Sequence, residues 1–298
     1  MKRNLQNKYN LKKIVIGTAQ LGMNYGISNK NGEISLNEMQ KIIDLCKKNS
    51  INTLDTAIDY GKSEKKLGDL KIKDFKMITK IANLNKNNTI SFVENEIKNS
   101  IKRLKISKLD TLLLHTSDDL RRNNKEEIYY ALQNCKDIGF CKKIGISAYQ
   151  YDQVNEIIDN FKIDVVQFPF NILNGVLIKK GLLNKLKEKN IEVHVRSVFM
   201  QGLLLMQNQK RNEYFKPWNN LFNDWEEWLI SNKFSALETC INYPFNFKEI
   251  DKVIIGVESY IQLNEIIKSI LESKVKLFPQ HLSSTDEALI NPSLWKLK

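Results

Sequence analysis

One segment is the key to the architecture of this chain: Leu54-Asp55-Thr56-Ala57-Ile58-Asp59-Tyr60-Gly61-Lys62-Ser63-Glu64. A short apolar run over residues 51–54 ends at Asp55, and Tyr60 follows in a loop. Catalytic side chains of parallel α/β folds gather where the strands end. We therefore expect Asp55 at the carboxyl end of a buried strand, with Tyr60 just beyond it.

Two later apolar runs end at further polar side chains. Residues 75–78 end close to Lys80, and residues 109–114 end directly at His115. A phenol, with a pKa of about 10, is a weak acid near neutral pH. A neighbouring ammonium lowers that pKa, an aspartate keeps the ammonium charged, and a histidine donates a hydrogen bond to the substrate oxygen. The set is suited to carbonyl reduction, with Tyr60 as proton donor and a cofactor as hydride source.

The order and spacing of these four residues, together with the motifs L-D-T-A-x-x-Y-G-x-S-E and L-L-L-H, resemble those of the aldo-keto reductase superfamily. The resemblance extends from Gly17 to about Glu265. It implies an α/β fold, a (β/α)8 TIM barrel forming one domain over residues 1–298. It also implies a nicotinamide cofactor and a catalytic tetrad of Asp55, Tyr60, Lys80 and His115.

The alternation of apolar runs with helical patterns supports a barrel independently. Strands are expected at residues 13–19, 51–54, 75–78, 109–114, 143–147, 164–167, 191–196 and 252–255. Helices are expected after a capping box at Ser35 and Glu38, and at residues 63–70, 89–104, 126–138, 151–161, 176–189, 224–231, 235–242 and 259–273. Eight strands in this length favour closure into a barrel. No Gly-x-Gly-x-x-Gly follows the first strand, which disfavours a Rossmann site.

Composition excludes several classes of protein. The net charge of +12 comes from basic residues spread over helix surfaces, so nucleic-acid binding is not expected. The four cysteines show no CxxC pairing and no metal-ligand cluster is evident, so we expect no metal, no disulfides and a reducing cytoplasmic location. Polar residues follow Met1, and no apolar run is long enough for a membrane span, so neither secretion nor a membrane partner is expected. The sequence leaves the oligomeric state open.

The resemblance also implies cofactor contacts. Ser147 and Gln167 match residues that bind the nicotinamide carboxamide, although Ala148 replaces the asparagine of the family. Arg196 stands where many members have an aromatic residue that stacks on the nicotinamide, and a planar guanidinium can also stack. The remaining cofactor contacts are expected at Thr18, Ala19, Ser197, Gly202, Leu203, Gly256, Glu258, Ser259, Gln262 and Glu265, and substrate contacts at Tyr25 and Trp218.

The resemblance implies NADP(H) as cofactor. Relatives that use NADP often have Lys or Arg where Glu258 and Gln262 stand, and a carboxylate there repels a 2′-phosphate. NAD(H) is therefore the alternative cofactor. A helix N-terminus near Ser259 is expected to bind phosphate through free backbone N–H groups.

The sequence predicts an NAD(P)(H)-dependent oxidoreductase that reduces an aldehyde or ketone to an alcohol. The wording of residues 17–26 is similar to that of bacterial members associated with surface-polysaccharide biosynthesis, which points to a sugar-derived small-molecule substrate. Two alternatives remain. One is a cofactor-binding, redox-sensing regulatory barrel with little turnover, and the other is a non-redox barrel enzyme acting on a phosphorylated sugar.

Overall fold

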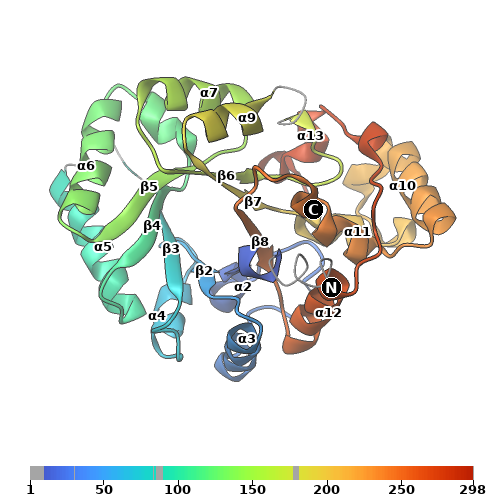
Figure 1. Ribbon diagram of the computed structural model, residues 1–298, viewed down its shortest axis with the longest axis horizontal. Coiled ribbons are helices and arrows are strands. Elements are labelled where there is room, and N and C mark those ends of the chain that lie inside the picture. The colour runs from blue at the N-terminus through green and yellow to red at the C-terminus, as the bar shows by residue number, and fades with distance from the viewer. Residues whose placement is uncertain (1–9, 30, 83, 85–89, 177–180, 298) are drawn as a thin grey trace.

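The strands form a closed parallel barrel. The computed structural model describes residues 10–29, 31–82, 84, 90–176 and 181–297. The barrel order is β1-β2-β3-β4-β5-β6-β7-β8, and β1 also pairs with β8 in parallel register. Figure 1 shows the helices arranged around these strands. The (β/α)8 barrel expected from the sequence is confirmed.

The strands are short and almost wholly buried because each is an apolar run enclosed by helices. Their bounds are Ile14–Gly17 (β1), Thr53–Asp55 (β2), Lys76–Ile81 (β3), Leu109–Leu114 (β4), Cys141–Ser147 (β5), Val165–Pro169 (β6), Glu192–Arg196 (β7) and Lys252–Gly256 (β8). The first strand is shorter than expected, because the chain turns at Thr18 into a helical turn, α2 (Ala19–Gly22). This turn begins the loop that leads to the next helix at Leu36.

The helices follow the apolar stripes of the sequence. Their bounds are Leu36–Lys48 (α3), Ser63–Gly68 (α4), Ile90–Leu104 (α5), Lys125–Asp137 (α6), Tyr151–Asn160 (α7), Leu182–Glu188 (α9), Asn219–Asn232 (α10), Ala236–Asn242 (α11), Tyr260–Leu271 (α12) and Glu287–Ile290 (α13). Of the helix expected over residues 176–189, residues 177–180 lie outside the described residues, as do Thr89 and the chain start. Helix α10 begins five residues before the expected 224, since Trp218 and the end of a preceding 3-10 helix lead directly into it.

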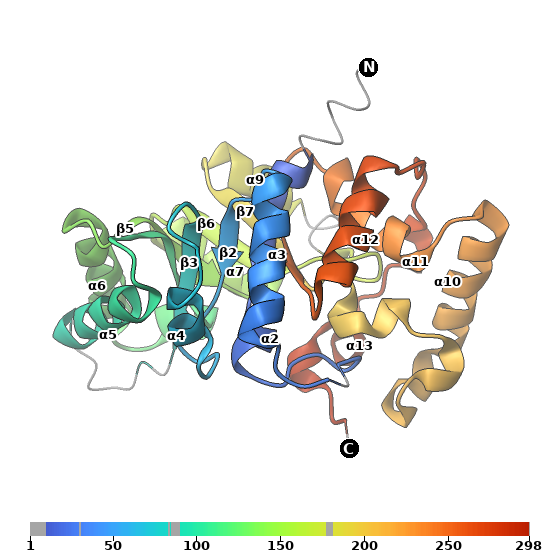
Figure 2. The same cartoon turned by 90° about the horizontal axis from the view of Figure 1, so that it is seen from below.

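The capping box at the start of α3 forms only in part. The Ser35 hydroxyl accepts a hydrogen bond from the Glu38 amide at 3.2 Å, as expected. The Glu38 carboxylate instead accepts a hydrogen bond from the backbone N–H of Tyr260, at 2.7 Å. This contact is possible because α3 and α12 lie side by side (Figure 2). Glu38 therefore ties two neighbouring helices together instead of closing its own cap.

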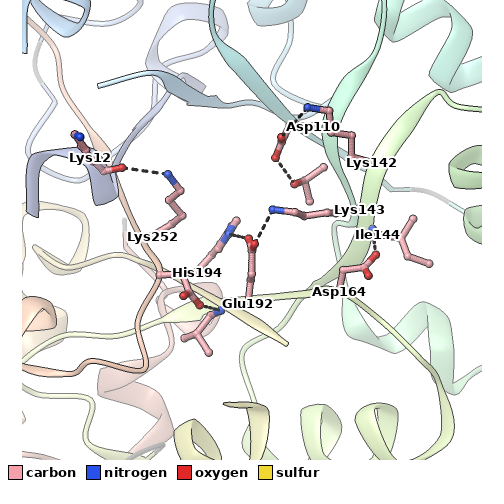
Figure 3. A network of polar contacts seen from close by, with 12 residues as sticks. Lys12, Asp110, Lys142, Lys143, Ile144, Asp164, Glu192, His194 and Lys252 are labelled. Carbon is pink, nitrogen blue, oxygen red and sulfur yellow. Dashed lines mark hydrogen bonds and ion pairs between the residues drawn. The ribbon is translucent and has the colours of Figure 1, made fainter. Parts of the chain in front are cut away.

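A network of charged side chains occupies the amino-terminal end of the strands. The Glu192 carboxylate lies 2.6 Å from the Lys143 ammonium and 3.3 Å from His194 Nε2 (Figure 3). The bond from His194 and the charge of Lys143 lower the pKa of Glu192 to about 2. His194 is buried within this network. These contacts link β5 and β7 at the amino-terminal end of the strands, opposite the end where a parallel barrel places its chemistry.

The tail packs on the segment that follows β7. Trp218 donates a hydrogen bond from Nε1 to Asp286 at 3.0 Å, and Tyr214 donates one to the Ala288 carbonyl at 2.9 Å. Trp295 lies edge-on to Phe215 with ring centroids 4.9 Å apart. Within the described ranges, no helix combines the length and apolar character needed to cross a membrane.

Candidate active site

Three strands and one loop bring the expected tetrad to one end of the barrel. Asp55 is the last residue of β2, Lys80 is the penultimate residue of β3, and His115 follows β4 directly. Tyr60 lies in the loop between β2 and α4. The four side chains therefore meet at the carboxyl ends of the strands, where a parallel barrel places its chemistry.

Lys80 and Asp55 form a buried ion pair. They are 1% and 3% exposed, and the Lys80 ammonium bonds both to the Asp55 carboxylate and to the Thr56 carbonyl, the latter at 3.0 Å. The second carboxylate oxygen of Asp55 accepts a hydrogen bond from Gln167 Nε2 at 2.8 Å. Burial lowers the pKa of Lys80, and the negative charge of Asp55 opposes that shift. Asp55 thus holds the lysine in place and favours its charged form.

The Tyr60 ring lies between Lys80 and His115. The Lys80 ammonium is 5.2 Å from the centroid of the Tyr60 ring, and the Tyr60 and His115 rings meet edge-on with centroids 5.7 Å apart. The sequence predicted a lowered pKa for this phenol, and that prediction is wrong. Burial, followed by the charge of Asp55, raises the pKa of Tyr60. The phenol is therefore protonated at neutral pH and ready to donate its proton.

His115 is neutral at physiological pH. Burial and the positive charges of Lys80 and Arg196 lower the pKa of His115 to about 4. Its Nδ1 lies 3.8 Å from an Asp59 carboxylate oxygen, too far for a strong hydrogen bond. A neutral imidazole can still donate one hydrogen bond to a substrate oxygen.

This lowered pKa predicts a flat pH dependence. Because the imidazole is already neutral above about pH 5, carbonyl reduction is expected to show no acid limb near the ordinary histidine pKa of about 6.5. The chain has only three histidines, so comparison with His115→Gln assigns the His115 signals in an NMR titration of the imidazoles. A His115 titration midpoint near 6.5, or a loss of kcat/KM below pH 7 that disappears in His115→Gln, contradicts the assignment.

A second layer of hydrogen bonds holds the tetrad loop. The Ser63 hydroxyl donates to the Thr18 carbonyl at 3.0 Å and accepts from the Thr56 hydroxyl at 3.1 Å. The Thr18 hydroxyl in turn contacts the Asp55 carbonyl at 3.0 Å. Ser63 therefore joins the ends of β1 and β2 behind the Asp55 carboxylate.

Two glycines allow the Tyr60 loop to approach α2. A Cβ on Gly22 would lie 1.9 Å from the Tyr60 carbonyl oxygen, and one on Gly61 would lie 2.4 Å from the Gly22 carbonyl oxygen. Gly61 also has a φ of +53°, in the left-handed region that favours glycine. The position of Tyr60 thus depends on backbones that touch without side chains between them.

A cavity of about 430 Å³ opens beside Tyr60. Eleven of the side chains expected to contact cofactor or substrate line it, together with Asp55 and Tyr60: Thr18, Ala19, Tyr25, Gln167, Arg196, Ser197, Gly202, Gly256, Glu258, Gln262 and Glu265. Residues from both ends of the chain therefore meet around one space, which extends from Asp55 and Tyr60 to the start of α12.

Four of the expected contacts lie outside this lining. Ser147 is buried beside Gln167 in the register of β5 and β6, and Leu203 is fully buried. The Ser259 hydroxyl caps its own helix by accepting a hydrogen bond from the Gln262 amide at 3.2 Å. Trp218 belongs to the aromatic cluster under the tail and is held by Asp286. The structure therefore gives no support to a substrate contact by Trp218.

The start of α12 differs from a free phosphate-binding helix end. Its Tyr260 amide is bonded to the Glu38 carboxylate, and the Glu258 amide donates to Gln262 Oε1 at 2.8 Å. The bond from Tyr260 lowers the pKa of Glu38, whereas burial raises the pKa of Glu258. Side chains thus occupy amides that the sequence analysis expected to be free, and two carboxylates lie at this end.

Sequence reasoning missed several residues of the site. Gln20, Ser28, Phe199, Gln201, Ala236 and Leu237 also line the cavity. Gln201 has a φ of +55°, and a Cβ on the following Gly202 would lie 2.2 Å from the Ser28 hydroxyl oxygen. The polar residues next to glycines in G-T-A-Q-L-G and M-Q-G were the available signal. The contact between Glu38 and Tyr260 had no signal in the sequence, because α3 and α12 are far apart in the chain.

The fold is a (β/α)8 barrel in which Asp55, Tyr60, Lys80 and His115 lie together at one end. The family model for the aldo/keto reductase family matches residues 13–289, and the chain belongs to that family. Members act on small-molecule carbonyl compounds with NAD(P)H, so the general activity is NAD(P)H-dependent carbonyl reduction. No curated protein matches the chain in sequence.

Solved structures share the fold at low sequence identity. The holo form of the aldo-keto reductase AKR11C1 from Bacillus halodurans is 19% identical, with a TM-score of 0.75 over 91% of this chain and 92% of that one. The glycerol dehydrogenase AKR11B4 from Gluconobacter oxydans is 18% identical, with a TM-score of 0.67 over 92% of this chain and 88% of that one. At these identities the likeness shows the fold alone.

Proposed function

We propose that the chain reduces an aldehyde or ketone to an alcohol, with Tyr60 as general acid. The observation that supports this most directly is the juxtaposition of the Tyr60 ring with the buried Lys80–Asp55 pair and with His115, where Tyr60 and Asp55 line the cavity. A side-chain acid that donates a proton in the transition state contributes about 10²- to 10⁴-fold to the rate. The similarity of residues 17–26 to bacterial members associated with surface-polysaccharide biosynthesis favours a sugar-derived substrate.

The cavity has a side-chain group suited to the nicotinamide carboxamide. Gln167 uses its Nε2 to hold Asp55, and its Oε1 is buried without a hydrogen-bond partner within the described structure. A buried, unsatisfied carbonyl oxygen is costly unless a ligand donor satisfies it. A donor such as the carboxamide N–H₂ would satisfy this oxygen, which supports a carboxamide contact by Gln167, with Ser147 on the neighbouring strand. The bound nicotinamide supplies the hydride for the carbonyl carbon.

The protein side chains handle the proton and the substrate oxygen. Tyr60 donates its proton to that oxygen, and neutral His115 donates a hydrogen bond that orients it. The ammonium of Lys80 stabilises the phenolate left behind, and Asp55 fixes the lysine. Since burial raises the pKa of Tyr60, the phenolate depends on this stabilisation.

The free, buried thiols of the cysteines support the expected cytoplasmic location.

We propose a preference for NAD(H) over NADP(H). Glu258 and Glu265 line the cavity near the start of α12, and the Glu38 carboxylate occupies the Tyr260 amide. A 2′-phosphate at this end would meet carboxylates and amides already bonded within the chain. A ribose hydroxyl would instead donate a hydrogen bond to a carboxylate.

Fluorescence titration with NADH and NADPH tests this preference. We expect NADH to bind at least about 10-fold more tightly, since one unfavourable charge contact at a partly exposed site costs on the order of 1 kcal/mol or more. The double variant Glu38→Gln with Glu258→Lys should tighten NADPH binding by about 10- to 100-fold. Glu272→Lys, at a residue just past the far end of α12, is the control for the change in charge. It should leave the ratio of the Kd values for NADH and NADPH unchanged.

The same protein is then assayed for NADH oxidation over a panel of aldehydes and ketones. Turnover supports the reductase. Cofactor binding without turnover on any carbonyl compound favours the regulatory barrel, and absence of binding to either dinucleotide favours a non-redox enzyme. Equal or tighter binding of NADPH by the unaltered protein contradicts the proposed preference.

A further inference from the structure

Arg196 presents a cation inside the cavity. It is the last residue of β7, and it lines the cavity together with Tyr25 and Tyr60. Its guanidinium carbon lies 4.3 Å from the centroid of the Tyr149 ring, and Nη2 donates to the Ala148 carbonyl at 3.4 Å. One face of the guanidinium is therefore covered by an aromatic ring, while most of its five N–H donors remain available at the edge.

The charge of Arg196 has no acidic partner in the described ranges. No Asp or Glu there forms an ion pair with it, whereas Lys80, the neighbouring cation of the site, is paired with Asp55. The Arg196 charge contributes to the lowered pKa of His115 and opposes the raised pKa of Tyr60. The cation is thus close enough to the tetrad to act on the reacting end of a substrate.

We propose that Arg196 binds an anionic group, a carboxylate or a phosphate, on the carbonyl substrate. This inference rests on the proposed reductase function. A guanidinium matches both groups through paired N–H donors, and such charge-assisted bonds are about twice as strong as neutral ones. Tyr149 fixes the plane of the guanidinium, which reduces the entropy lost when the anion binds. The substrate class is a carbonyl compound with an acidic group, such as an acidic or phosphorylated sugar derivative.

Matched substrate pairs test the proposal. The first pair is succinic semialdehyde and its methyl ester, and the second is glyceraldehyde 3-phosphate and glyceraldehyde. We expect the unaltered protein to favour the anionic member of at least one pair by about 10-fold or more in kcat/KM. Which pair shows the larger ratio distinguishes a carboxylate from a phosphate as the natural group.

Arg196→Met should remove this preference. We expect the ratio of kcat/KM between the anionic and the neutral member of a pair to fall by about 10-fold or more, to near 1, mainly through a higher KM for the anionic member. Arg196→Lys keeps the positive charge but lacks the paired N–H donors of the guanidinium. Its preference for the anionic member should therefore lie between that of the unaltered protein and that of Arg196→Met. Lys98→Met, which removes a lysine of α5 that is ion-paired with Glu94, controls for the change in net charge and should leave the ratio unaltered.

Two results overturn the proposal. One is the absence of any anionic preference in the unaltered protein. The other is an equal loss of kcat/KM for both members of a pair in Arg196→Met, together with weaker NADH binding. That result would assign Arg196 to cofactor binding. If no compound is turned over, the reductase function fails separately. Titration of succinic semialdehyde and its ester into the protein–NADH complex then still decides whether Arg196 binds the anion.

Discussion

Tyr60→Phe is expected to reduce kcat/KM for carbonyl reduction by about 10³-fold while leaving the Kd for NADH within about 2-fold. The substitution removes only the phenolic oxygen, so the ring can keep its contacts with Lys80 and His115. What is lost is the proton donor for the substrate oxygen. Steady-state kinetics with saturating NADH and a fluorescence titration measure the two quantities separately.

Tyr130→Phe is the matched control for this variant. Tyr130 lies on α6 and is 61% exposed, so loss of its hydroxyl should change neither turnover nor cofactor binding. Full activity of Tyr60→Phe would remove the general acid from the proposed mechanism. A loss caused only by weaker NADH binding would make Tyr60 a cofactor residue instead.

Gly22→Ala is expected to lower both stability and turnover, although Gly22 carries no functional group. Its Cβ would lie 1.9 Å from the Tyr60 carbonyl oxygen and 2.6 Å from the Ser63 amide nitrogen, so the tetrad loop must move. Overpacking of this kind costs about 1–3 kcal/mol. A displacement of about 1 Å at the acid costs about 100-fold in rate. Thermal unfolding and kcat are the measurements.

Gly139→Ala provides the comparison. Gly139 has a φ of +84°, and a Cβ there would meet nothing within 4 Å, so the variant carries backbone strain far from the tetrad loop. It should lower the unfolding temperature without lowering kcat. If Gly22→Ala kept full turnover, close contact between α2 and the Tyr60 loop would not be what positions the acid.

The sequence predicted the barrel and the tetrad because both follow from local patterns. Apolar runs that end at Asp55 and His115 mark the carboxyl ends of strands, and parallel strands of a barrel share that edge. The ends of individual elements were less accurate. The chain leaves β1 at Gly17, two residues earlier than expected, because Ala19 already begins α2.

Properties that depend on three-dimensional surroundings were not accessible from the sequence. The raised pKa of Tyr60 follows from burial, which no spacing of residues reveals. The Glu38 contact with Tyr260 joins two helices from opposite ends of the chain, and the stacking of Arg196 on Tyr149 joins the ends of β5 and β7. Roles for the cofactor-side residues stay predictions.

The bond from Gln167 to Asp55 has a consequence for biogenesis. Asp55 is paired with Lys80 of β3 and with Gln167 of β6, and Gln167 lies 112 positions further along the chain than Asp55. A nascent polypeptide that has left the ribosome only as far as β5 lacks the second of these bonds. Both hydrogen-bond partners of the carboxylate that holds Lys80 are therefore present only once β6 has been added to the barrel.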